Sequence, residues 1–280
     1  MIPQFPKFTK LELSHKKIVD EFFERFPTYS EFSFANMFVW DVAKPVMLSV
    51  LNDNLIIQFI DFKTQKHYLS LIGSNDIDDT IQEMIHYSIN NNLHPSLSTV
   101  PEHVVSQIKN KALLDIAEDS DNCDYIISVP LIANLEGNDI EGKRQKVNHF
   151  INTHKDGLSF HRLDLSDPEV MAQARRVLEE WLMPLKGHSN DIVAEFAAIE
   201  KAIKHHKEVQ LEAYGVSING VLEAFSIIEK VHDRTVIGHF EKGNKDHSGI
   251  YEYMNHNLCR YLKNEGYEYL NICQDMGDEG

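Results

Sequence analysis

The chain has 280 residues, of which 42% are hydrophobic, and this is enough apolar material for one large core or two ordinary ones. Its 43 acidic residues outnumber its 27 basic ones, so the formal net charge is −16. This charge excludes a general nucleic-acid binder, and a DNA-binding protein in particular, because that class first of all needs a positive field.

Hydrophobic periodicity in the first half of the chain predicts strands and helices in alternation. Strands are expected over residues 46–50, 55–60, 67–72, 96–100, 113–117 and 125–129. Helices are expected to start at Ser14, Asp76 and Pro101, and the proline stands where its missing N–H is not needed.

The second half opens with three predicted helices. The first is basic and covers residues 143–154. The second starts at Ser166, where a capping residue, an early proline and an acidic residue follow one another. The third carries an apolar stripe over residues 192–203. A boundary is expected over residues 130–142, which gives an N-terminal lobe over 1–130 and a C-terminal lobe over 131–280.

Residues 211–272 have the most specific order of elements. Asn219 and Gly220 suit the two positive-φ positions of a hairpin turn between strands over 211–218 and 221–229. A strand over 235–241, a polar loop, a helix from Gly249 and a strand over 267–272 follow. This is the core order of a GNAT-type acyltransferase lobe, in which a cleft lies beside the strand that enters the helix. We therefore expect an α+β fold of two tandem GNAT-like lobes, each a mixed, mostly antiparallel sheet with flanking helices.

Ordered motifs along most of the chain resemble those of one bacterial protein family. The matching segments are YSEFSF at 29–34 with Trp40, DYIISV at 124–129, LEG at 135–137, KRQKVNHF at 143–150, HFEK at 239–242, GIY at 249–251 and the frame from Asn271 to Gly277. The family is similar to the C-terminal domain of phosphatidylglycerol lysyltransferases and, more distantly, to Fem-type peptidoglycan aminoacyltransferases. The resemblance implies a tandem GNAT fold and, by analogy, aminoacyl transfer.

Two departures from the family pattern stand near the end of the chain. Ile272 and Cys273 replace the usual arginine and glutamate, and the family continues past its final glycine with a basic helix and a strand. We therefore expect the C-terminal lobe to lack its last helix and strand, which would expose a sheet edge.

Aminoacyl transfer needs a proton acceptor and a group that stabilises the developing oxyanion. Glu241 and Lys242 are expected where the central strand ends beside the cleft, with Glu241 as the base and Lys242 as the stabilising charge. Asp275 is expected at the mouth of the same cleft, just past the parallel strand. The alternative for Glu241 and Lys242 is an ordinary surface ion pair at a strand end.

The substrate-binding residues are expected on two segments. Lys143, Arg144, Asn148 and His149 would grip a phosphate-bearing donor, and their alternative is a solvated helix face. The remaining ones are positions that match the family, with Gly249 at the floor of the cleft, Tyr251 beside it and Asn271 at the end of the parallel strand.

The loop before Gly249 departs from that of acetyltransferases. Ordinary GNATs hold the pyrophosphate of coenzyme A in a Q/R-x-x-G-x-G/A loop at a helix N-terminus, whereas this chain has Asn244 and His247 at two of these positions. We expect no tight acetyl-CoA binding and no cofactor, with acyl-CoA as a co-substrate in the alternative case. The histidines lack ligand spacing, so no metal is expected.

Three functions remain open at this point. The first is transfer of an aminoacyl group from aminoacyl-tRNA to a lipid, a peptide or a small amine. The second is acyl-CoA-dependent N-acyl transfer, and the third is a non-catalytic binding module on a GNAT scaffold. The three cysteines form no C-x-x-C pair, and the N-terminus does not resemble a signal peptide, so we expect a cytoplasmic protein. No apolar run is long enough to span a bilayer, so no transmembrane segment is expected. The oligomeric state does not follow from the sequence.

Overall fold

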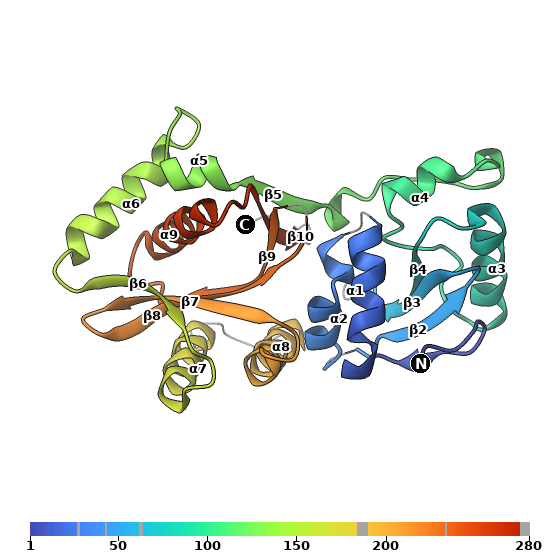
Figure 1. Ribbon diagram of the computed structural model, residues 1–280, viewed down its shortest axis with the longest axis horizontal. Helices are drawn as coiled ribbons and strands as arrows, with labels where there is room; N and C mark the ends of the chain where they lie inside the picture. The colour runs from blue at the N-terminus through green and yellow to red at the C-terminus, as the bar shows by residue number, and fades with distance from the viewer. Residues whose placement is uncertain (27–28, 43, 62–63, 184–189, 233, 275–280) are drawn as a thin grey trace. The chain divides into compact units, whose positions relative to one another are not determined.

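The computed structural model describes residues 1–26, 29–42, 44–61, 64–183, 190–232 and 234–274 (Figure 1). The chain forms two compact units, Met1–Asp124 with Gln274–Gly280, and Tyr125–Cys273, which are called the first and the second unit below. Each unit has helices beside a β-sheet, so the fold is α+β. None of the helices in the described ranges combines the length and the apolar character that crossing a bilayer requires.

The first unit contains a four-stranded antiparallel sheet in the order β1-β2-β3-β4. The strands are β1 (Thr9–Lys10), β2 (Met47–Leu51), β3 (Asn54–Ile60) and β4 (His67–Ile72). Asn52 and Asp53 have φ values of 50° and 57°, which suit a two-residue turn, so the predicted hairpin is confirmed. The helices are α1 (Lys16–Arg25), α2 (Phe34–Trp40), α3 (Ile77–Asn90) and α4 (Glu102–Gln107).

Two segments predicted as strands in this half are loops. Residues 96–100 run beside β4, where Ser98 N donates to Leu69 O at 3.2 Å, but Thr99 has a φ of 53° and breaks the extended conformation. Residues 113–117 follow a 3-10 turn (Lys111–Leu113), and the Leu113 side chain is exposed. A strand needs a packed face, and in this segment Leu114 alone packs on the core while residues 113 and 115–117 are exposed.

The second unit contains a six-stranded sheet in the order β5-β10-β9-β8-β7-β6. The strands are β5 (Asp124–Ser128), β6 (Leu158–Leu163), β7 (Leu211–Ile218), β8 (Val221–Lys230), β9 (Thr235–Gly243) and β10 (Tyr269–Gln274). β6 to β9 are antiparallel neighbours, and β10 runs parallel to β9. β5, which the predicted division at residue 130 assigns to the N-terminal lobe, joins this sheet as an edge strand.

Helices cover both faces of the second sheet (Figure 1). α5 (Val129–Asn134), α6 (Glu141–His154) and α9 (Ile250–Asn264) lie on one face, where Phe150 and Met254 pack on Val216 and Ala224. α7 (Pro168–Leu182) and α8 (Asn190–His205) lie on the other face. Successive side chains of a strand point to opposite faces, so each residue of β8 and β9 is directed to one helix layer or the other.

Two irregularities open the sheet beside α9. Ile227 pairs with Phe240 and Ile228 with Gly238, so His239 is the extra residue of a β-bulge in β9. The parallel pairing of β9 and β10 runs from Tyr269 opposite Thr235 to Asn271 opposite Ile237, whereas β9 continues to Gly243. Residues 238–241 of β9, beyond Ile237, line the site described below.

Candidate functional site

A cavity of about 350 Å³ lies in the second unit beside β9, beyond the residues that pair with β10 over 269–271. Its polar lining consists of Lys143, Ser226, Glu241, Tyr251, Glu252 and Asn255. Apolar side chains from β5, α5, α9 and β10 form the rest of the wall, and residues 238–240 of the bulge line it as well. The side chain of His239 is 1% exposed although the residue as a whole is half-buried, so the main chain of His239 faces the opening.

Glu241 is the central carboxyl group of this cavity. It lies opposite Ser226 in the β8–β9 ladder, and its Oε1 accepts a hydrogen bond of 2.9 Å from Asn255 Nδ2 of α9. Burial raises the pKa of Glu241 to about 8, and the hydrogen bond from Asn255 opposes this shift without cancelling it. A carboxyl group with this pKa can both take up and release a proton near neutral pH.

Glu252, in the first turn of α9, is a second carboxyl group on the same cavity. Lys146 Nζ of α6 lies 2.7 Å from its Oε1. Burial by itself would raise the pKa of Glu252. The hydrogen bond and charge of Lys146, together with the charge of Lys143, outweigh burial and hold this pKa below its ordinary value. One cavity thus holds a carboxyl group that favours its proton and another that stays ionised, a separation typical of acid–base sites.

The other polar and sulfur groups of the lining have structural roles. Tyr251 Oη donates to Gly243 O and accepts from Gly243 N, each at 3.1 Å, and therefore joins α9 to the end of β9. Burial raises the pKa of the Cys259 thiol to about 12, so this cysteine is no thiolate nucleophile at neutral pH.

Lys242 lies on the opposite face of the sheet from Glu241, because the two residues are adjacent in β9. Its Nζ is 2.7 Å from Glu195 Oε1 of α8 and 3.9 Å from the centre of the Trp181 ring of α7. The structure therefore places the Lys242 side chain outside the cavity that Glu241 lines.

The basic residues predicted on α6 separate into different roles. Lys143 is exposed and lines the cavity, as expected for a substrate contact. Arg144 Nη1 instead donates to Leu135 O at 2.9 Å, just after the last turn of α5, so this arginine holds a helix end, and it does not line the cavity. Asn148 and His149 are exposed and lie outside the lining of the cavity.

Of the three remaining predicted residues, Gly249 and Asn271 do not contribute side chains to the lining. Gly249 has a φ of 92°, and a Cβ there would meet Lys146 O at 2.8 Å, so this glycine is required for the contact between α9 and α6. Asn271 is buried, and its Oδ1 accepts a hydrogen bond from Cys273 N at 2.8 Å. Asp275 lies outside the described residues.

Sequence reasoning missed Glu252, Asn255 and the bulge at His239. A signal for the first two exists, because both are polar residues close to the apolar stripe of α9 and three positions apart on one face. The bulge has no comparable signal, since it depends on how many residues of β9 the ladder with β8 accommodates.

The profile of the family described as "Phosphatidylglycerol lysyltransferase, C-terminal" matches residues 23–278. A conserved protein of unknown function from Bacteroides thetaiotaomicron VPI-5482 is 20% identical, with a TM-score of 0.79 over 100% of this chain and 93% of that one. The C-terminal domain of a protein assigned as a lysylphosphatidylglycerol synthetase, from Agrobacterium fabrum, is 12% identical, with a TM-score of 0.63 over 94% and 78%. L-PGS from Bacillus licheniformis is 15% identical, with a TM-score of 0.61 over 92% and 78%.

No curated protein matches the chain in sequence. The solved structures share its fold, which confirms the predicted α+β class, and the two sheets agree with the expected tandem GNAT-like lobes. The family match covers most of the chain and confirms the resemblance carried by the motifs. The chain therefore belongs to the phosphatidylglycerol lysyltransferase C-terminal family, and it is a transferase of the aminoacyltransferase type.

Proposed function

We propose that the chain transfers an aminoacyl group from aminoacyl-tRNA to a lipid, a peptide or a small amine, with Glu241 as the general base. The observation that carries this proposal is the buried carboxyl group of Glu241, whose pKa is about 8, in a cavity bounded by the bulged strand β9 and by α9. The open volume also argues against the reading as a binding module with a filled cleft.

The chemistry begins when the acceptor amine or hydroxyl attacks the carbonyl carbon of the aminoacyl ester. The ionised Glu241 takes the acceptor proton as the new C–N or C–O bond forms. The ester bond to the tRNA ribose then breaks, and the same proton passes to the leaving ribose oxygen. Residues 238–240 of the bulge line the cavity, and we assign stabilisation of the oxyanion to this wall.

Charge on α6 supports a donor that carries phosphates. Lys143 is exposed at the cavity, while Lys146 is paired with Glu252 beside it. A local basic helix on an acidic protein gives a defined approach for a polyanion without making the whole surface attractive to nucleic acids.

The test is a transfer assay with tRNA that carries labelled lysine and with phosphatidylglycerol vesicles or a free amine as acceptor. We expect labelled product from the wild-type chain and none from Glu241→Gln. Glu179→Gln is the matched control, because Glu179 is exposed on α7 at the other face of the sheet. Full activity of Glu241→Gln would remove Glu241 from the mechanism. Failure of the wild-type chain with a panel of aminoacyl-tRNAs would reject the donor.

A further inference from the structure

The loop between β9 and α9, residues 244–249, corresponds in sequence to the Q/R-x-x-G-x-G/A loop with which acetyltransferases hold a diphosphate. A helix N-terminus attracts anions through its free N–H groups and its dipole. The start of α9 would therefore be the natural site for the diphosphate of a nucleotide-based acyl donor, unless other groups already engage it.

Four main-chain donors of this loop and of the start of α9 are engaged within the protein. Asn244 N donates to Glu223 O at 2.8 Å, and Asp246 N donates to Asn244 Oδ1 at 3.0 Å. His247 N donates to Asn244 O at 3.2 Å, and Ile250 N donates to His247 O at 3.1 Å. The loop thus satisfies these groups by folding on itself and on β8.

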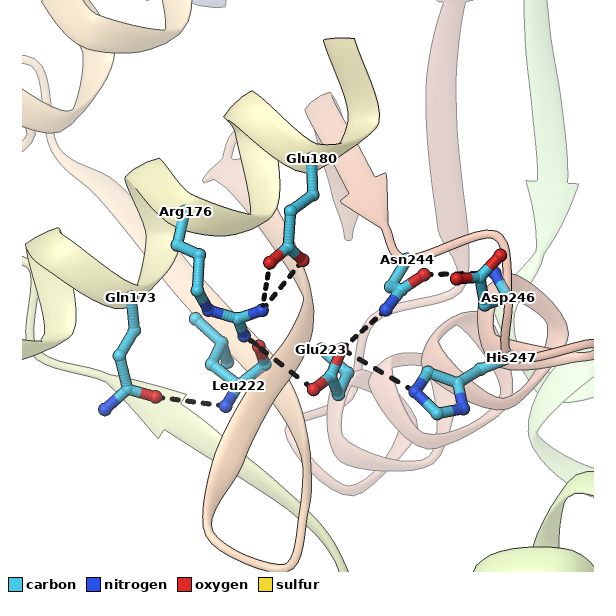
Figure 2. A network of polar contacts seen from close by, with 8 residues as sticks. All are labelled: Gln173, Arg176, Glu180, Leu222, Glu223, Asn244, Asp246 and His247. Carbon is cyan, nitrogen blue, oxygen red and sulfur yellow. Dashed lines mark hydrogen bonds and ion pairs between the residues drawn. The ribbon is translucent and has the colours of Figure 1, made fainter. Parts of the chain in front are cut away.

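The carboxylate of Glu223 supplies a negative charge at the same place (Figure 2). Asn244 Nδ2 donates to its Oε2 at 3.0 Å, and His247 Nε2 lies 3.6 Å from that oxygen. Arg176 Nη2 of α7 lies 3.8 Å from Oε1, and Arg176 is also paired with Glu180. The side chain of Glu223 is 12% exposed, so this is a largely buried anion with partners on two sides.

Helix α6 covers the loop from the other side. A Cβ on Gly249 would lie 2.8 Å from Lys146 O and 3.3 Å from Phe150 Cβ, which shows how closely α6 approaches the start of α9. The rings of His154 and His247 are 5.0 Å apart in an edge contact. A bound diphosphate would have to displace this cover and would also meet the charge of Glu223.

We propose that Glu223 is an internal anion that replaces a donor diphosphate at the start of α9 and so excludes coenzyme A thioesters from this loop. The two side chains that depart from the acetyltransferase pattern, Asn244 and His247, both contact its carboxylate. This inference rests on the proposed function because it names a class of acyl donor that the same lobe rejects. Its test measures ligand binding and does not require transfer activity.

The test measures binding of coenzyme A and of inorganic pyrophosphate to the purified chain by calorimetry, and the thermal midpoint with and without pyrophosphate. For the wild-type chain we expect a Kd weaker than about 1 mM for both ligands and no rise in the midpoint. Glu223→Gln keeps the side-chain shape and removes the charge, so pyrophosphate should bind at least about tenfold more tightly. Glu180→Gln is the control, because Glu180 contacts Arg176 without contacting the loop, and it should behave as wild type.

Low-micromolar binding of coenzyme A by the wild-type chain would overturn the proposal, as would a folded Glu223→Gln variant with no gain in pyrophosphate binding. If Glu223→Gln fails to fold, the thermal midpoint of the wild-type chain with and without pyrophosphate still tests the proposal. A midpoint that rises with pyrophosphate overturns the proposal, and an unchanged midpoint supports it. None of these outcomes bears on whether Glu241 catalyses transfer, because no acceptor or tRNA is present.

Discussion

His239 Nε2 lies 2.9 Å from Glu229 Oε2, across the β8–β9 ladder and at the bulge itself. The two side chains are 1% and 9% exposed, so this is a buried polar pair. Because it engages the side chain of the extra residue, it holds the bulge in place while the main chain of His239 remains available to the cavity.

Replacing His239 by leucine should lower the free energy of unfolding by about 1–3 kcal/mol, because Glu229 would then be buried without its partner. Urea unfolding measures the change. The double variant His239→Leu/Glu229→Leu should recover part of the loss, since removing both partners costs less than removing one. Equal stability of the single variant and the wild type would contradict the structural role of the pair.

The second prediction concerns the pH dependence of stability at Glu241. Its pKa is about 8 in the folded chain and near 4.5 when unfolded, so the folded state binds the extra proton between these values. Its contribution to stability is therefore complete below pH 4.5 and is lost as pH rises through 8. Glu241→Gln should lack this decline, so the variant should gain stability relative to wild type as pH increases across the window.

The comparison between the two chains is essential here, because another carboxyl group titrates in the same range. Burial raises the pKa of Glu31 in the first unit to about 7, although a hydrogen bond from Gln274 works in the opposite direction. Subtracting the two unfolding curves removes that contribution. A constant difference between wild type and Glu241→Gln from pH 5 to 9 would show that Glu241 does not titrate as described.

The third prediction links Asn255 to the pH profile of transfer. Its hydrogen bond favours the ionised form of Glu241, so Asn255→Leu should raise the pKa of Glu241 further. The rising limb of the rate against pH should then move to higher pH. Asn257→Leu is the matched control, because Asn257 Nδ2 donates to Tyr253 O on the same helix and Asn257 does not line the cavity. Identical profiles for wild type and Asn255→Leu would argue against Glu241 as the base.

The fourth prediction separates two lysines that the sequence placed in one site. Lys242→Met should cost about 1 kcal/mol of stability by removing the contacts to Glu195 and Trp181, and it should leave the catalytic constant of the folded enzyme close to wild type. Lys143→Met should leave stability unchanged, weaken donor binding and reduce its dependence on salt. The reverse pattern would return Lys242 to the site.

Local signals were sufficient for most of the second sheet. Asn219 and Gly220 have the positive φ values that the turn prediction requires, and the expected strand over 211–218 matches β7. β6 and α5 were not predicted. β6 alternates exposed and partly buried residues, and α5 is only one and a half turns long, so neither gives a strong periodic signal.

The composition of the site was less accessible to sequence reasoning than its location. Glu241 and Lys242 are neighbours in sequence, and the alternation of a strand was enough to separate them. The partner of Arg144 could not be foreseen, because Leu135 O is offered by a left-handed residue at the end of a short helix. Long-range pairings such as Glu223 with Asn244 arise only once β8 and the loop are folded together.

Tyr251 and Gly243 bear on how this lobe can change during evolution. The tyrosine hydroxyl occupies both hydrogen-bonding groups of Gly243, as the backbone of one more neighbouring strand would. The end of β9 and the first turn of α9 are therefore joined by these hydrogen bonds as well as by the loop between them. Insertions between residues 244 and 248 would lengthen the connection while leaving the wall of the cavity fixed, so this loop can acquire new contacts without rebuilding the cavity beside it.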